Sequence, residues 1–211
     1  MIKFSIFKIP VQVLPWFWVT LVFLGGGLYA DSRQDFLELL LFMIAGFISI
    51  LVHELGHALT AKHFGNRVEI VLEAFGGYAA YSGGPMSRPR SFIITAAGPA
   101  IQILLGIAAF LFLRTFPAIS PNAIIFVKTL YSISFFWAIL NLLPVLPLDG
   151  GQLLQAVLGP KRLRITLIIS MSVAIIAAIL VWSGTGSFLF PIFLGMFAYQ
   201  SYKALREMSY R

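Results

Sequence analysis

Two histidines and a glutamate form the pattern His-Glu-x-x-His at His53, Glu54 and His57, inside an apolar stretch from about 36 to 64. Residues four apart in an α-helix share a face, so both imidazoles can reach one metal ion, with Glu54 on the same side. A zinc ion lowers the pKa of its bound water to about 7, and a neighbouring carboxylate can accept the proton. A lone histidine in an apolar segment is usually a core residue, but this cluster is costly to bury in lipid and therefore indicates a metal site for hydrolysis.

The composition is that of an integral membrane protein. Of the 211 residues, 59% are hydrophobic and 11% are charged, and the mean hydropathy is +0.92. A soluble domain has about 25% charged residues. The chain has no cysteine, which excludes disulfides and thiolate ligands, so a zinc ion would have to be held by His, Asp or Glu.

Hydropathy predicts an all-α polytopic membrane protein that forms a single domain over residues 1–211. Each expected span is near the length needed to cross about 30 Å of hydrocarbon. The expected spans cover residues 11–30, 36–64, 91–113, 123–146, 164–182 and 188–205.

Basic residues are distributed unevenly between the two sides of this predicted topology. With the N-terminus in the cytosol, three of the 15 Lys and Arg residues lie outside, namely Arg33, Arg114 and Lys128, and the other twelve lie inside. This bias follows the positive-inside rule and places both termini in the cytosol. The net charge of +7 is thereby explained without nucleic acid, and the histidine motif falls in the cytosolic half of the second span, where a polar cavity must admit water.

The segment between the second and third spans is expected to form a small membrane-associated β-hairpin. Residues 68–72 are rich in β-branched side chains, Gly76-Gly77 is a turn signal, and residues 78–81 could form a second strand. The alternative is a plain surface loop. An edge strand here could pair with the backbone of an unwound substrate.

The fourth span ends in a helix break with an acidic residue. Pro144, Pro147 and the pair Gly150-Gly151 interrupt the helix on the same side as the histidines, which makes Asp149 the candidate third metal ligand. An ordinary turn is the alternative reading of Asp149-Gly150. His63 is a poorer candidate because it lies roughly 9 Å along the helix from His57.

Two further positions carry polar or small residues with open roles. Asn141 could hydrogen-bond a substrate carbonyl or a developing oxyanion, or equally could bridge helices. The small-residue run 96–100, which includes Gly98 and Pro99, is interpreted as helix packing.

Together, His53-Glu54-x-x-His57 and Asn141-x-x-Pro144-x-x-Pro147-x-Asp149-Gly150 resemble the site-2 protease family of intramembrane zinc metalloproteases. The resemblance implies one zinc ion per chain, held by His53, His57 and Asp149. It implies that Glu54 is the catalytic acid and base and that Asn141 lies near the active site.

The resemblance also extends to two regions outside these motifs. The turn Phe75-Gly76-Gly77 is similar to the family's membrane-associated β region, which implies a role in substrate binding. Gly98-Pro99 is similar to a signature in the third span, but Gln102 stands where many members have Asn or Ser, so no role is carried over. A compact form without PDZ or CBS domains is expected.

The leading hypothesis is a zinc-dependent peptidase that cuts a membrane-spanning or membrane-associated protein near the cytosolic face, in regulated intramembrane proteolysis. Its partners would be that substrate and the lipid bilayer, and its location a prokaryotic cell membrane. The alternatives are a metal-ion transporter, since intramembrane His and Asp also line ion paths, and a catalytically inactive relative that binds membrane segments.

Overall fold

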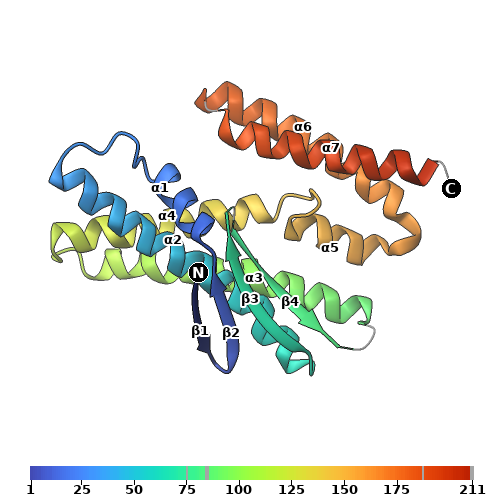
Figure 1. Ribbon diagram of the computed structural model, residues 1–211, viewed down its shortest axis with the longest axis horizontal. Coiled ribbons are helices and arrows are strands. Elements are labelled where there is room, and N and C mark those ends of the chain that lie inside the picture. Colours follow the sequence, from blue (N-terminus) through green and yellow to red (C-terminus); the bar gives the residue numbers. More distant parts are fainter. Residues whose placement is uncertain (75, 84–85, 187, 210–211) are drawn as a thin grey trace. The chain divides into compact units, whose positions relative to one another are not determined.

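The computed structural model describes residues 1–74, 76–83, 86–186 and 188–209 (Figure 1). Contacts divide the chain into two compact units, residues 1–86 with 97–138 and residues 87–96 with 139–211. The elements in chain order are β1 (Ile2–Ile6), β2 (Ile9–Val13), α1 (Pro15–Leu24), α2 (Arg33–His63), β3 (Arg67–Glu73), β4 (Gly76–Ser82), α3 (Arg88–Thr115), α4 (Pro121–Asn141), α5 (Asp149–Leu158), the 3-10 helix η1 (Pro160–Arg162), α6 (Leu163–Thr185) and α7 (Leu189–Ser209).

Among the described residues, four helical segments are long and apolar enough to cross a membrane, which agrees with a multi-pass membrane protein. These segments are Arg33–His63, Arg88–Thr115, Pro121–Asn141 and Pro160–Gly184. The expected sixth span corresponds to α7, a helix of 21 residues that is not among these four, so its crossing stays a prediction.

The expected first span, residues 11–30, is not one long helix. Residues 9–13 form β2, and the apolar helix α1 that follows has 10 residues. Ile9, Val11 and Val13 are buried whereas Pro10 is exposed, which is the alternation of a strand with one buried face. The sequence prediction missed this strand because its five residues run directly into the apolar residues of α1.

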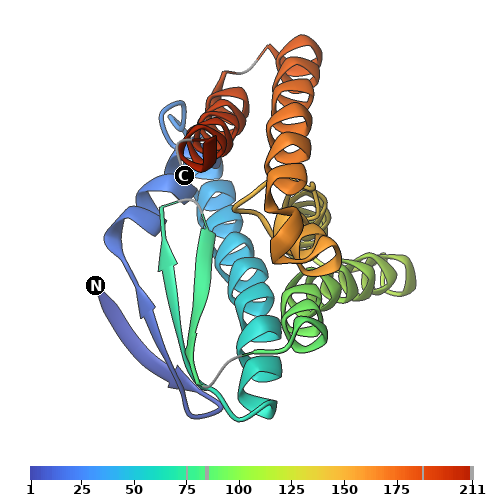
Figure 2. The ribbon, with the colours of Figure 1, turned by 90° about the vertical axis from the view of Figure 1, so that its right-hand side faces the viewer.

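The β-structure is a four-stranded sheet in the order β1-β2-β3-β4, larger than the expected hairpin. β2 and β3 are parallel, and the two outer pairs are antiparallel. Gly76 pairs with Glu73, so Gly76 and Gly77 belong to β4 and not to the expected turn. β4 is therefore an edge strand, and Figure 2 shows the sheet lying along α2.

Helix α2 is defined by clear signals at both ends. Ser32 and Asp35 form a capping box at its N-terminus, with the Ser32 hydroxyl oxygen accepting from the Asp35 N–H at 3.1 Å. Lys62 lies in its last turn and donates to the carbonyl oxygen of Phe7 at 2.7 Å, which ties the helix to the β1–β2 turn. The position of the site helix against the sheet is thus held at its C-terminal end.

One hydrophobic core cluster of the first unit is formed by the sheet, α1 and α2. Its buried members are Ile9, Val11, Val13, Phe17, Leu21, Ile50, Leu51, Ala58, Ile70 and Leu72. In the second unit, α6 and α7 lie side by side in both ribbon views, and Val145, Ala174 and Ala198 form a smaller buried cluster.

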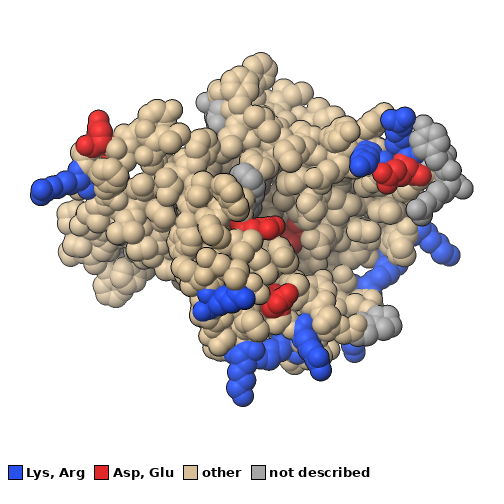
Figure 3. Space-filling view, in the orientation of Figure 1, with Lys and Arg blue, Asp and Glu red and all other residues tan. Residues whose placement is uncertain are grey.

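Basic residues gather at one end of the sheet. The pairing of Val11 with Ile70 continues toward Lys8 and Arg67, which therefore lie at the same end, and Lys62 reaches the turn there. Figure 3 shows Lys and Arg around this end, while most of the face in view carries no charge. The expectation that these cations lie on the cytosolic side of the membrane stays a prediction.

Replacing Ile70 by Ala tests the core between sheet and helix. Ile70 is fully buried, and truncation of such a side chain costs about 2–5 kcal/mol of folding free energy. Unfolding in detergent micelles would measure this loss. Ile2→Ala on β1, where the side chain is 52% exposed, is the matched control and should change stability by less than about 0.5 kcal/mol. Equal effects of the two substitutions would contradict the described core.

Candidate metal centre

His53 and His57 project from the same face of α2, with the Nε2 atoms of the two rings directed at each other. Their Nε2 atoms are 3.1 Å apart, and the side chains are 4% and 8% exposed. Two imidazole nitrogens bound tetrahedrally to one zinc ion at 2.0–2.1 Å would be about 3.3 Å apart. The spacing of the two nitrogens therefore fits a shared metal ion.

Helix α3 leaves room for His57 by carrying a glycine at the point of contact. A Cβ atom built on Gly98 would lie 2.2 Å from the Nε2 atom of His57. On the opposite helix, a Cβ atom on Gly56 would lie 2.6 Å from the carbonyl oxygen of Ala97. The sequence reasoning interpreted the run around Gly98 as packing, but this contact places Gly98 in the histidine site.

The second ring nitrogen of His53, Nδ1, has a hydrogen-bond partner on α3. This atom lies 3.0 Å from Oε1 of Gln102, a side chain that is fully buried. Metal-ligating histidines usually donate the hydrogen of the second ring nitrogen to such an acceptor. Sequence reasoning assigned Gln102 no role, although Gly98 and Gln102 have the same spacing of four residues as the two histidines.

Glu54 is buried between α2 and the sheet, next to the first residues of β4. A Cβ atom on Gly77 would lie 2.8 Å from Glu54 Cγ, so the glycine backbone comes directly against this carboxylate side chain. Gly76 has a φ of +138°, a conformation that favours glycine. Phe75, the first residue of the expected substrate-binding turn, lies outside the described residues.

Asp149 is the first residue of α5 and is buried. As expected from the prolines, α4 ends at Asn141 and the helix is interrupted before Asp149. The Leu146 N–H donates to Ser170 Oγ at 3.1 Å, and a Cβ atom on Gly150 would lie 2.2 Å from the carbonyl oxygen of Leu142. Asp149 thus follows a tightly packed loop, and Asn141, half-buried, is the last residue before that loop.

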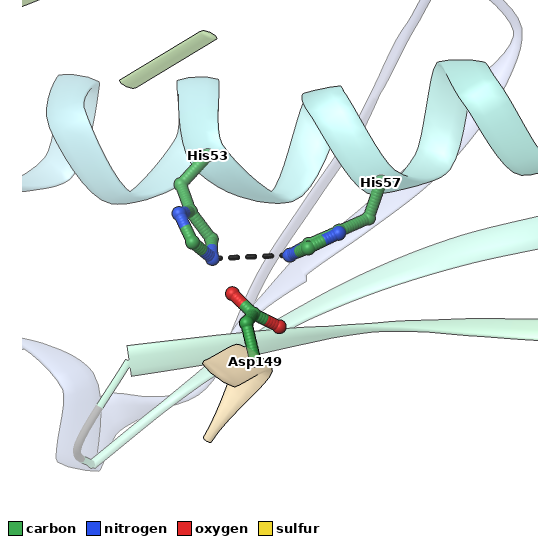
Figure 4. Close-up of side chains that lie close together, drawn as sticks. All are labelled: His53, His57 and Asp149. Carbon is green, nitrogen blue, oxygen red and sulfur yellow. Dashed lines mark hydrogen bonds between the residues drawn. The ribbon is translucent and has the colours of Figure 1, made fainter. Parts of the chain in front are cut away.

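Among the described residues, His53, His57 and Asp149 each carry one side-chain atom that could bind a metal ion. His53 and His57 belong to the first compact unit and Asp149 to the second. Figure 4 shows the rings of His53 and His57 facing each other on α2. Two imidazole nitrogens and a carboxylate oxygen are a donor set that suits zinc and leaves a fourth position for water.

Long apolar helices, one of which carries a buried His-Glu-x-x-His motif, define a membrane protein with a candidate metal site. A sequence model of the Peptidase M50B-like family matches residues 36–150, more than half of the chain. The chain therefore belongs to this family, and the resemblance to site-2 proteases is confirmed.

Individual relatives support the same relationship. A zinc metalloprotease of Methanocaldococcus jannaschii is 32% identical over 159 residues, which cover 75% of this chain and 45% of the relative. Stage IV sporulation protein FB of Bacillus subtilis is 32% identical over 148 residues, which cover 69% of this chain and 46% of the relative. The matched segments thus span less than half the length of these two curated relatives.

A solved structure resembles almost the whole chain. The site-2 protease from Methanocaldococcus jannaschii superposes with a TM-score of 0.70 at 28% identity, over 95% of this chain and 94% of that one.

The contact between Gly98 and His57 predicts the effect of a single added methyl group. Gly98→Ala should displace the imidazole and lower the affinity for zinc by at least about tenfold, in the range found for residues that orient a ligand. Chelator competition on the purified protein would measure the affinity. Gly195→Ala on α7, where an added Cβ has no atom within 4 Å, is the control and should bind zinc as the wild type does. Unchanged affinity in Gly98→Ala would show that His57 does not depend on this contact.

Proposed function

We propose that this protein is an intramembrane zinc metalloprotease that hydrolyses a peptide bond in a membrane-spanning or membrane-associated protein. The observation that carries this proposal is the pair of converging imidazole nitrogens with the buried Glu54 beside them, on a helix apolar enough to cross a membrane. Relatives named zinc metalloproteases and the similar site-2 protease support it.

The proposed zinc site consists of His53, His57 and Asp149. Bound zinc would lower the pKa of a coordinated water to about 7 and polarise the substrate carbonyl group. His53 and His57 would each present Nε2, and Asp149 would contribute a carboxylate oxygen and neutralise part of the ion's charge. The absence of cysteine from the chain leaves His and carboxylate groups as the available ligands.

Glu54 is proposed as the group that moves the proton. Its carboxylate accepts a proton from the attacking water, whose oxygen adds to the carbonyl carbon of the scissile bond. Glu54 then donates this proton to the amide nitrogen as the C–N bond breaks, which releases an amine and a carboxylic acid. Its burial keeps the carboxylate away from bulk water, where it would be exposed to competing solvent protons.

The edge of β4 is proposed to receive the substrate. A peptide bond in a helix is shielded by neighbouring side chains and hydrogen bonds, so the substrate must unwind before cleavage. An extended segment could add to the free edge of β4 through backbone hydrogen bonds, and Gly77 would bring it close to Glu54. Asn141 is proposed to donate a hydrogen bond from its side-chain amide group to the substrate carbonyl oxygen.

The reaction is proposed to take place near the cytosolic face. Lys8, Lys62 and Arg67 lie together at one end of the sheet, and the positive-inside rule places such a cluster in the cytosol. This orientation would put both termini in the cytosol, in the cell membrane of a prokaryote. Regulated proteolysis of a membrane protein is the process that this arrangement would serve.

Glu54→Gln should abolish cleavage while zinc remains bound. The amide cannot accept the proton of the attacking water, so turnover should fall by about 1,000-fold or more. The assay would incubate purified protein with a library of single-span peptides in ¹⁸O-labelled water and detect labelled carboxyl termini by mass spectrometry. Glu69→Gln, at an exposed position of β3, is the matched control and should retain activity. Full activity of Glu54→Gln would refute the proposed acid and base.

Asp149→Ala should weaken zinc binding more strongly than any change outside the ligand set. Loss of one of three ligands should lower the affinity by more than about 100-fold, whereas Asp31→Ala, at an exposed position, should leave it unchanged. Zinc content after dialysis would measure the difference. Zinc that is retained equally by both variants would remove Asp149 from the site. Transport of zinc into proteoliposomes without any cleavage product would favour the transporter hypothesis instead.

A further inference from the structure

A continuous row of buried polar side chains leads from His53 across three helices of the first unit. Gln102 on α3, Ser49 on α2 and Ser134 on α4 are all fully buried. His53 Nδ1 lies 3.0 Å from Gln102 Oε1, Gln102 Nε2 lies 3.0 Å from Ser49 Oγ, and Ser49 Oγ lies 3.0 Å from Ser134 Oγ. The row therefore connects a proposed metal ligand to side chains outside the proposed ligand set.

The orientation of the Gln102 amide is determined by its contact with an atom that can only accept a hydrogen bond. Gln102 Nε2 also lies 3.3 Å from the backbone carbonyl oxygen of Ser49, which can only accept a hydrogen bond. The amide NH₂ group must therefore face Ser49, because the reverse orientation would bring two acceptor oxygens together in a buried place. The amide oxygen Oε1 is consequently the atom that faces His53.

This orientation decides which nitrogen of His53 carries the hydrogen in the neutral ring. Oε1 of Gln102 can only accept, so Nδ1 of His53 must be the donor. The lone pair of the neutral ring is then on Nε2, the atom that faces His57.

Two residues of α3 contact the two histidines, and both pairs have a spacing of four residues. Gly98 leaves space for the His57 ring, and Gln102 holds the His53 ring by a hydrogen bond.

We propose that Gln102 is a positioning residue that holds His53 in its Nδ1–H form with Nε2 directed at the metal position. Ser49 holds the Gln102 amide in this orientation, and Ser134 in turn holds the Ser49 hydroxyl group. The proposal rests on the proposed zinc site for its consequence, but the state of His53 itself can be measured in the metal-free protein.

The decisive comparison is between Gln102→Leu and Gln102→Glu. Leucine fills a similar volume without a hydrogen-bond acceptor. Glutamic acid keeps an acceptor oxygen for Nδ1–H, and in its neutral form its hydroxyl group can donate to Ser49 as the Gln102 amide does. In protein labelled with ¹⁵N-histidine at about pH 8, above the usual histidine pKa of about 6.5, NMR would report the protonated nitrogen. The chain has three histidines, so His53→Gln identifies the His53 signals.

The wild type and Gln102→Glu should show Nδ1–H at His53, and Gln102→Leu should shift toward the Nε2–H form. Zinc affinity should fall by about 10- to 100-fold in Gln102→Leu and recover in Gln102→Glu. Ser134→Ala, which removes only the partner of the Ser49 hydroxyl group, should cause a smaller loss in the same direction. Ser201→Ala, which removes another buried hydroxyl group, is its control and should change neither readout.

An unchanged His53 signal in Gln102→Leu would overturn the proposal. Equal losses of zinc affinity and stability in the Leu and Glu variants would also overturn it, because they would indicate a purely structural role. Failure of the wild type to bind zinc would instead contradict the proposed function, and the NMR comparison would still decide the role of Gln102.

Discussion

The need to bury two imidazole rings in an apolar helix is the constraint on which the rest of the first unit depends. Hydrocarbon supplies no water to replace a missing hydrogen bond, so each ring needs a protein partner or space made for it. Helix α3 meets both needs with Gln102 beside His53 and Gly98 against His57. The close approach of the two helices also requires Gly56, where a side chain would collide with the backbone of α3.

The sheet brings a free backbone edge to the same helix. Its buried side chains pack on α2, and the chain order of the strands leaves β4 at the edge, with Gly77 against Glu54. The absence of a side chain thus leaves space at two points of the first unit, at Gly98 against His57 and at Gly77 against Glu54.

Two of the expectations from sequence depended on local patterns and differed in outcome for physical reasons. The apolar lengths predicted α2, α3, α4 and α6 because a membrane span is a local property of about 20 residues. The same reasoning misplaced the N-terminal segment, since the five-residue alternation of β2 is short and continues into an apolar helix. A parallel pairing of β2 with β3 depends on residues nearly sixty positions apart, which no local pattern reports.

The sequence by itself determined the properties that depend on neighbouring residues. The spacing of His53 and His57 places both rings on one helical face, and the prolines after Asn141 end α4 before Asp149. The tertiary structure decided the contacts between distant segments: the partner of His53 on α3, the space at Gly98, and the strand beside Glu54. These contacts depend on how the helices and the sheet pack. The shape of a side chain and the direction of its hydrogen bonds predict a contact only when the surface opposite that side chain is known.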